Sequence, residues 1–500
     1  MNTFNRKTLY AALAGLGAIG ATGAVEAVNL NPDGLGQVLI YPYYTVRSNA
    51  AGAAYNTLIS VVNTTASAKA VKVRFVEGKN SKEVLDFNLF LSGHDVWTAA
   101  VVATATGAGV TSDDKSCILP SQLPKNGQPP QLFVNFAYSS DTTILSDGTK
   151  VAGDTTLDRT REGYVEIIEM ARYWDTSTTS INVTHVGGTP YACGDMTDAI
   201  AAESPITGNG GLFGGVTLIN VQEGSAYSQD ATALDNFATN GDIYFNAGSA
   251  SPSLADVNPA VSVVIANGAA VITDWTVAPN LSLDAVSAVL MHDSVLNEYS
   301  TDPGVLANTD WVVTMPTKST GSSPYVKVGT GAAIHPFQRN FNGTAGACDD
   351  VSVKTWDREE KSPSTPGGFS PPPPPGKASS LCWEANVLTF QANGILGSVN
   401  SKLVGGIGAN NQINGWAKLT FVYSNATLIG GATTQVTLGV NGTSTSNFTS
   451  ATYAGLPVVG FAVQSYNNNL IVVNGKNIQS TYGADFAHRF TTKVTPGLVP

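Results

Sequence analysis

Residues 69–91, with the sequence KAVKVRFVEGKNSKEVLDFNLFL, decide the fold class of the chain. Apolar side chains occupy every second position in both halves of this stretch: Val71, Val73 and Phe75, then Leu85, Phe87, Leu89 and Leu91. Polar side chains stand between them: Lys72, Arg74, Asp86 and Asn88. Successive side chains of a β-strand point to opposite faces, so the pattern predicts two amphipathic strands joined by a turn at 77–81.

Similar alternation recurs along the 500 residues, and we expect an all-β protein. Short strands separated by turn residues are typical of β-sandwiches. We predict a first sandwich domain over residues 28–200 and a larger β-sandwich region with long loops over residues 201–500. A stretch rich in Gly, Ala and Thr at 195–215 suggests the boundary.

The first 27 residues have the layout of a secretory signal peptide. Arg6 and Lys7 precede an apolar stretch at 8–24, and residues 25–27 (VEA) offer a small residue for cleavage. The apolar stretch is too short and too rich in Gly for a membrane-spanning helix. We expect a protein that is secreted, exposed at the cell surface or held in the periplasm, with no transmembrane segment after cleavage.

The composition narrows the partners of such a protein. Only 13% of the residues are charged, and the net charge is −11. A chain with scattered acidic charge lacks the basic surface that nucleic acid requires. Its polar surface then consists mainly of Ser, Thr, Asn and Gly, as in many extracellular β proteins.

The chain contains four cysteines, Cys117, Cys193, Cys348 and Cys382. An even number in an exported protein indicates disulfides, and four cysteines allow three pairings. We prefer the sequential pairing, Cys117 with Cys193 and Cys348 with Cys382, because each bridge then lies inside one predicted domain. No two cysteines have the CxxC spacing of a metal site.

A Pro-rich segment at 362–380 lies between the last two cysteines and holds five consecutive prolines at 371–375. Such a run adopts polyproline II and cannot join a sheet. We expect an exposed loop whose base is tied by the second disulfide. The alternative is a ligand for the aromatic groove of a partner protein.

Residues 56–91 resemble the immunoglobulin-like sandwich domains of exported bacterial proteins. The resemblance rests on the strand 58–63 (LISVVN), the turns at 63–65 and 78–81, the strand that ends at Phe75, and Phe87. It implies a fold and not an activity. Aromatic and charged residues are dense at 297–299, 309–318 and 356–359, where the chain resembles an uncharacterised group of secreted Gram-negative proteins.

Catalytic and metal-binding motifs are weak. His292, Asp293 and Ser294 supply the residue types of a serine hydrolase triad, but neighbours on a strand face opposite ways and no G-x-S-x-G elbow surrounds a serine. We expect no catalytic residue and no cofactor. Three groups of carboxylates are candidate ligands for a structural calcium ion, although none has the EF-hand pattern: Asp113 with Asp114, Asp349 with Asp350, and Asp230 with Asp235 and Asp242.

Two pairs of Trp and Glu flank the Pro-rich segment, Trp356 with Glu359 and Trp383 with Glu384. A Cys348–Cys382 bridge would bring them into one cluster. Trp rings stack on the apolar faces of sugars, so this cluster is a candidate ligand surface. The alternative is that the tryptophans cover the core beside the disulfide while the carboxylates face solvent.

We therefore expect a non-enzymatic exported protein, either a structural or assembly subunit of the cell surface or an adhesin-like binding module. Its partners would be other surface proteins, further copies of itself, or glycans. The run at 37–46 is apolar on both faces and adds the hypothesis of assembly through an exposed edge strand. The alternative function is a secreted carbohydrate-binding or carbohydrate-active protein that uses Trp356, Glu359, Trp383 and Glu384.

Overall fold

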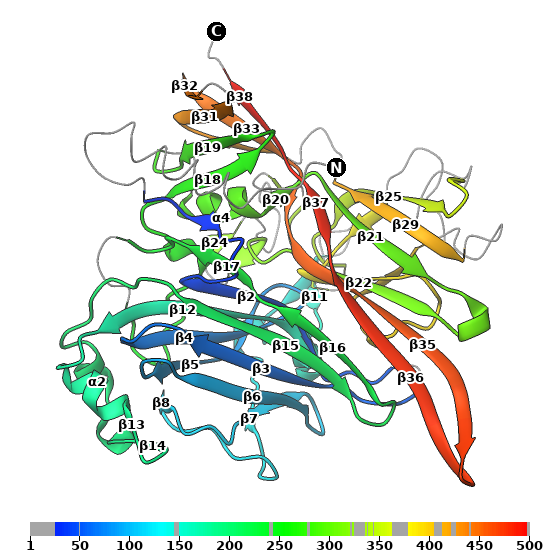
Figure 1. Ribbon diagram of the computed structural model, residues 1–500, viewed down its shortest axis with the longest axis horizontal. Helices are drawn as coiled ribbons and strands as arrows, with labels where there is room; N and C mark the ends of the chain where they lie inside the picture. Colours follow the sequence, from blue (N-terminus) through cyan, green and yellow to red (C-terminus); the bar gives the residue numbers. More distant parts are fainter. Residues whose placement is uncertain are drawn as a thin grey trace.

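The computed structural model describes residues 26–49, 51–144, 150–239, 244–277, 281–320, 323–324, 336–337, 339–343, 345–362, 379–404, 413–421, 427–439 and 442–497. Their strands form stacked, mostly antiparallel sheets (Figure 1), which confirms the all-β sandwich fold. The predicted signal peptide, apart from its last two residues, lies outside the described residues. The same holds for most of the Pro-rich segment, residues 363–378.

Two sheets form the first sandwich. The seven-stranded sheet has the order β1 (Asn29–Leu30), β17 (Thr232–Asp235), β2 (Val38–Thr45), β12 (Glu162–Tyr173), β4 (Ala68–Glu77), β5 (Glu83–Leu91) and β8 (Cys117–Leu119). The six-stranded sheet has the order β16 (Ser225–Asp230), β15 (Leu212–Asn220), β3 (Asn56–Asn63), β6 (Val96–Ala103), β7 (Ala108–Thr111) and β9 (Gln131–Leu132).

The stretch at 69–91 forms β4 and β5, and their register pairs Val73 with Phe87. The apolar side chains of both strands pack between the two sheets, against Trp97 and Val101 of β6. Burial of one large apolar side chain contributes roughly 1.5–3 kcal/mol, so this alternation is what holds the two layers together.

Strands from beyond residue 200 complete the first sandwich. β15 pairs with β3, and β17 pairs with β2. The sheets therefore continue across the boundary predicted near residue 200. The Gly-rich stretch serves close packing rather than a linker, because a Cβ at Gly214 would collide with the backbone oxygen of Ser60.

β2 is an interior strand, so the hypothesis of an exposed edge strand at 37–46 is wrong. It lies between β17 and β12, and all eight of its residues are buried. Its side chains alternate between two apolar clusters: Leu39 faces the six-stranded sheet, and Ile40 faces the second half of the chain. The run is apolar on both faces because both faces are covered.

Two five-stranded sheets form a second sandwich. The first has the order β26 (Ser379–Leu381), β25 (Asp349–Asp357), β29 (Asn414–Thr420), β21 (Ser294–Ser300) and β37 (Arg489–Thr491). The second has the order β28 (Ser401–Leu403), β27 (Ala385–Thr389), β22 (Asn308–Thr314), β35 (Val459–Val473) and β36 (Lys476–Ala487). Val295 and Leu419 of the first sheet share one apolar core with Trp311 of the second sheet and with Phe390, which follows β27.

A seam cluster joins the two sandwiches. Its residues are Tyr43, Tyr55, Leu218 and Tyr227 from the first sandwich, and Val312, Ala385, Val387, Ile395, Leu396, Phe461 and Val463 from the second. All are buried, so the contact between the sandwiches is an apolar core and not a flexible hinge.

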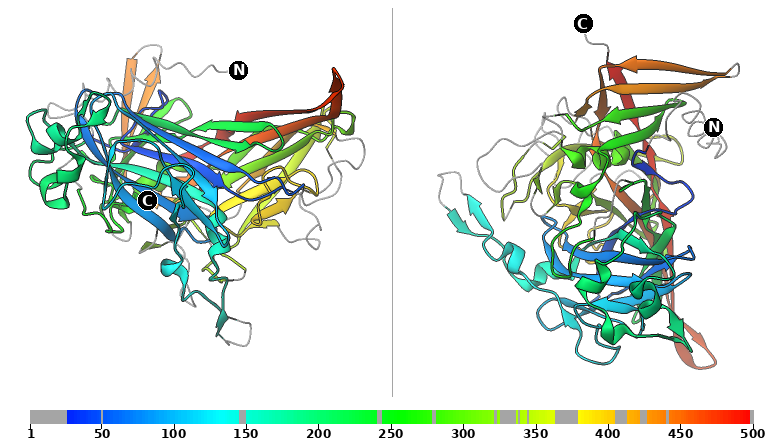
Figure 2. Two further views of the ribbon diagram at one scale, coloured as in Figure 1. Left: turned by 90° about the horizontal axis from the view of Figure 1, so that it is seen from below. Right: turned by 90° about the vertical axis from the view of Figure 1, so that its left-hand side faces the viewer.

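Smaller elements complete the described chain. A four-stranded sheet contains β18 (Val261–Ala266), β19 (Ala269–Asp274), β31 (Thr433–Gly439) and β32 (Gly442–Phe448), and a three-stranded sheet contains β30 (Thr427–Gly430), β33 (Ser450–Ala454) and β38 (Lys493–Gly497). Figure 2 shows the β31–β32 hairpin standing out from the body.

Four strand pairs are β10 (Thr142–Ile144) with β11 (Lys150–Ala152), β13 (His185–Val186) with β14 (Thr189–Pro190), β20 (Met291–His292) with β34 (Leu456–Pro457), and β23 (Ser319–Thr320) with β24 (Ser323–Pro324). The described α-helices are α2 (Thr178–Val183), α3 (Asp198–Ala201) and α4 (Ser282–Leu290). The 3-10 helices are Phe136–Tyr138, Leu157–Arg161, Cys193–Asp195, Leu254–Asp256 and Pro303–Val305. None of the described helices has the length and apolar character needed to cross a bilayer.

The disulfides Cys117–Cys193 and Cys348–Cys382 both form. The sequential pairing predicted from the sequence is confirmed. The first bridge joins β8 to a 3-10 helix, and the second ties the start of β25 to the end of β26.

Candidate binding surface

An aromatic row crosses the outer face of the sheet that contains β25, β29 and β21. Trp356, Trp416 and Glu298 hold facing positions on these three strands. The two indole rings are stacked, with centroids 4.1 Å apart and planes 8° apart. Trp416 keeps 39% of its surface exposed, so this stack faces solvent instead of filling the core.

A basic row lies beside the aromatic row. Lys354, Lys418, Leu296 and Arg489 hold facing positions on β25, β29, β21 and β37. The Lys354 ammonium lies 4.8 Å from the centroid of the Trp356 ring, within the range of a cation–π contact. These three cations lie together on a chain whose net charge is −11, and the Glu298 carboxylate lies in the neighbouring row.

The four residues predicted as a ligand surface lie at two ends of β25. Trp356 and the exposed Glu359 are at its end, whereas Trp383 and Glu384 follow Leu381, which pairs with Asp349 at its start. A strand rises about 3.3 Å per residue, so roughly 23 Å separates Trp356 from Asp349. The disulfide joins residues at the start of β25, and it therefore does not bring the two pairs together.

Trp383 and Glu384 lie at the contact with the first sandwich. The ammonium of Lys79 is 5.3 Å from the centroid of the Trp383 ring. Glu384 is fully buried, and burial raises the pKa of its carboxyl well above the usual value; Lys318 opposes this rise and Glu77 adds to it. A carboxyl in this place cannot contact a ligand at the surface.

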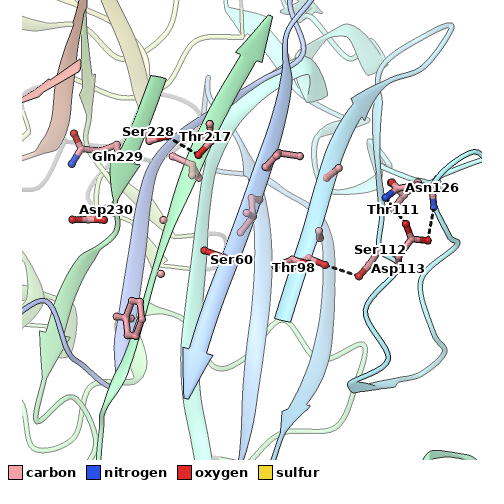
Figure 3. A pocket seen from close by; sticks show the side chains of 18 residues that line it. Ser60, Thr98, Thr111, Ser112, Asp113, Asn126, Thr217, Ser228, Gln229 and Asp230 are labelled. Carbon is pink, nitrogen blue, oxygen red and sulfur yellow. Dashed lines mark hydrogen bonds between the residues drawn. The ribbon is translucent and has the colours of Figure 1, made fainter. Parts of the chain in front are cut away.

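A hollow of about 630 Å³ lies on the outer face of the six-stranded sheet (Figure 3). Several of its hydroxyl groups bind neighbouring protein groups: Thr217 Oγ1 lies 2.8 Å from Ser228 Oγ, and Ser112 Oγ donates to the carbonyl of Thr98 at 2.6 Å. Leu58 is exposed in the middle of this face. The hollow is open and lined by short polar side chains as well as apolar ones, and the described residues that line it include no stacked aromatic rings or row of cations.

Ser92, Asp95 and His185 meet beside a second open pocket, a grouping that sequence reasoning missed. Ser92 Oγ lies 3.3 Å and Asp95 Oδ2 lies 3.6 Å from the same ring nitrogen, His185 Nδ1. In a catalytic triad the serine and the aspartate contact different ring nitrogens. Residues 93 positions apart in the chain meet here, so no local motif signals the grouping.

The consecutive His292, Asp293 and Ser294 do not form a triad either. The His292 ring stacks on Phe490, and its Nδ1 lies 3.0 Å from the hydroxyl of Thr492. Burial lowers the pKa of His292 to about 3. Its imidazole is therefore held neutral against the core, and the hydroxyl of Ser294 contacts Thr491 and Asp293 instead.

The predicted calcium ligands are dispersed. Asp113 accepts a hydrogen bond from Asn126 at 2.7 Å, and Asp349 pairs with Lys318 at 3.0 Å. Asp242 lies outside the described residues. Within the described part of the chain, no three His, Cys, Asp or Glu side chains are placed to hold one metal ion.

Sequence reasoning found Trp356 but missed Trp416, Lys418 and Arg489. Strand pairing alone places Trp416 and Lys418 beside β25 and Arg489 at the far edge of the same sheet, and all three lie 60 or more positions further along the chain. Alternation within 414–420 predicts that Trp416 and Lys418 share a face, but not which strand lies next to them.

The sequence matches no protein-family model and no curated protein. Its class is therefore defined by the structure: an all-β protein of stacked sandwiches with two disulfides.

Proposed function

We propose that the chain is an exported, non-enzymatic, adhesin-like binding protein with immunoglobulin-like character, and that its ligand is an anionic polysaccharide. Its binding surface is the aromatic–basic face, defined as Trp356, Trp416, Lys354, Lys418 and Arg489. The observation that carries the proposal is the solvent-facing Trp356–Trp416 stack beside a row of cations.

Export and the lack of catalysis rest on separate grounds. The leader-like residues 1–27 support secretion, and two disulfides fit an oxidising compartment outside the cytoplasm. The non-catalytic role is supported by the two Ser–His–Asp groupings, neither of which has the geometry of a proton relay.

The spacing of the two rows fits a charged sugar. Trp356 and Lys354 are two residues apart on one strand, so the rows lie about 7 Å apart on the same face. A sugar ring stacked on Trp416 would place a carboxylate or sulfate substituent near Lys418. A long anionic polymer would contact Lys354 and Arg489 at the two ends of the basic row.

Binding to alginate, a carboxylated polysaccharide, tests the proposal, with uncharged dextran for comparison. We expect alginate to bind and dextran to bind far more weakly, and binding to weaken as salt rises. Trp416→Ala should raise the dissociation constant for alginate about two- to thirteenfold, because it removes an aromatic contact of ~0.5–1.5 kcal/mol. Lys418→Gln should also weaken binding to alginate.

Trp174→Ala is the matched control. Trp174 lies on the first sandwich, is 58% exposed, and also has a cation over its ring, since Arg172 lies 5.3 Å from its centroid. This variant should bind alginate as the unmodified protein does. Absence of alginate binding, or equal losses in Trp174→Ala and Trp416→Ala, would contradict the proposal.

A further inference from the structure

Three ionisable side chains with no surface exposure lie together behind the Cys348–Cys382 bridge. Lys318, Asp349 and Glu384 are 0%, 1% and 0% exposed. The Nζ atom of Lys318 lies 3.0 Å from Oδ2 of Asp349 and also donates to the carbonyl of Ala347. The disulfide fixes the other two groups, because Asp349 follows Cys348 directly and Glu384 comes two residues after Cys382.

Apolar side chains lie around the Lys318–Asp349 pair. The Lys318 ammonium lies 5.5 Å from the centroid of the Phe337 ring, and Phe341, Ala347 and Leu381 belong to the buried core. An amine and a carboxyl are thus held in contact where water has little access.

Glu384 is the third ionisable group near this pair. Its Oε2 accepts a hydrogen bond from Ser81 at 3.3 Å, while Oε1 has no hydrogen-bond partner among the described residues. Its carboxyl interacts electrostatically with both Lys318 and Asp349. A buried polar atom without a partner costs free energy, so its retention beside an amine and a carboxyl calls for an explanation.

We propose that Lys318 and Asp349 condense into an intramolecular isopeptide bond, with Glu384 as the group that transfers the proton. This inference is independent of the proposed glycan binding.

The reaction balances without an oxidant or a co-reactant. One proton moves from the Lys318 ammonium to the Asp349 carboxylate, which gives an amine and a carboxylic acid. The amine nitrogen then attacks Cγ of Asp349, and a C–N bond forms. Glu384 gives its proton to a departing oxygen of Asp349 and takes one from the nitrogen. The C–O bond breaks, one water molecule leaves, and Glu384 ends protonated as it began.

Burial supplies the physical reasons for this step. Burial raises the pKa of the Glu384 carboxyl well above its usual value, which favours the protonated form that can donate. Folding holds amine and carboxyl in contact, which replaces a bimolecular encounter. A buried ion pair carries a desolvation penalty of several kcal/mol per ion, whereas the amide product is uncharged. Exclusion of water also protects the product from hydrolysis.

The bond would join the two sheets of the second sandwich. Lys318 follows β22 of one sheet, and Asp349 begins β25 of the other. Together with the adjacent disulfide, it would give this region two covalent links, one of which withstands reduction.

Mass spectrometry of the full-length exported protein tests the inference. After reduction and alkylation, proteolysis should yield one linked product that contains both Lys318 and Asp349 and is lighter than the two free peptides by one water molecule. Lys69 and Glu169 provide an internal control, because this pair is equally buried with an Nζ–Oε1 distance of 2.5 Å. Backbone amides of Asn209 and Gly210 hold the Glu169 carboxylate, so its peptide should appear unlinked.

Two variants separate the chemistry from folding. Glu384→Gln keeps the size of the side chain but cannot relay the proton. The folded variant should therefore stay unlinked, and its mass should not fall by one water molecule. Lys318→Arg keeps the cation and should also stay unlinked. Recovery of Lys318 and Asp349 only in separate, unmodified peptides of the unmodified protein would overturn the proposal. So would loss of water confined to the Asp349 peptide, or full linkage in Glu384→Gln.

Discussion

Asp310 is a carboxyl without surface exposure in the middle of β22. Its Oδ2 accepts a hydrogen bond from the Leu396 amide at 2.9 Å, while Oδ1 has no partner among the described residues. Burial raises the pKa of Asp310 to about 7, and the amides of Leu396 and Ile395 offset this rise only in part. The group therefore titrates near neutral pH in the folded protein.

This shift makes stability depend on pH in a definite direction. The unfolded chain releases the Asp310 proton near the ordinary pKa of about 3.9, but the folded chain retains it up to about 7. The unfolded state binds fewer protons between these values, so stability should fall by a few kcal/mol as pH rises through this window. Asp310→Asn, whose amide oxygen can still accept from Leu396, should remove this loss.

Thermal unfolding at about pH 5 and about pH 8 checks the expectation. The quantity to compare is the melting temperature of the unmodified protein minus that of Asp310→Asn. This difference should be lower at the higher pH. Burial lowers the pKa of His292 to about 3 and that of His488 to about 4, and this effect reduces stability as pH falls instead. Both histidines are present in both proteins, so the difference isolates Asp310. An unchanged difference between the two pH values would refute the assignment.

Lys72 and Arg74 show what sequence can and cannot predict at this scale. Alternation correctly places their side chains on the face of β4 that Val73 does not share, because the direction of successive side chains is a local property of a strand. It does not predict that their face is covered. Lys72 is buried and donates to the carbonyl of Ser249, and Arg74 contacts Glu166 at 2.5 Å. The covering segment lies more than 170 residues away, and no local pattern indicates it.

At the scale of the element, β12 shows how one glycine permits a central strand. Gly163 lies where the register between β12 and β2 shifts. A Cβ at this position would collide with the backbone oxygen of Val76 and would lie 2.9 Å from the Tyr44 ring and 3.0 Å from the Glu77 Cα. The sequence predicts the strand, but only the pairing of three strands shows why this position excludes a side chain.

Gly163→Ala should therefore lower the free energy of unfolding by about 1–3 kcal/mol or more, because backbone atoms must move to admit one methyl group. Urea unfolding measures the loss. Gly194→Ala is the matched control, since a Cβ at Gly194 meets nothing within 4 Å. The two variants should differ clearly in midpoint, and equal midpoints would show that β12 tolerates the added atom.

At the scale of the whole molecule, the seam cluster decides whether the two sandwiches behave as one unit. Polar contacts extend it: the hydroxyl of Tyr43 donates to Glu162 at 2.7 Å, and that of Ser398, from the second half, donates to the same carboxylate at 2.6 Å. The sequence predicts two separate regions because each has its own alternation. Contact between them depends on side chains such as Phe461, whose partners come from β2, β15 and β16.

Phe461→Ala tests this coupling. Phe461 is fully buried in the seam, and loss of its ring should cost about 3–5 kcal/mol. Because the seam is apolar and continuous, we expect the unmodified protein to unfold in one calorimetric transition and the variant to lower that transition or split it in two. Val472→Ala, at a 68% exposed position on the same strand, should leave it unchanged. Two separate transitions in the unmodified protein, of which Phe461→Ala shifts only one, would show instead that the sandwiches fold independently and that the seam forms afterwards.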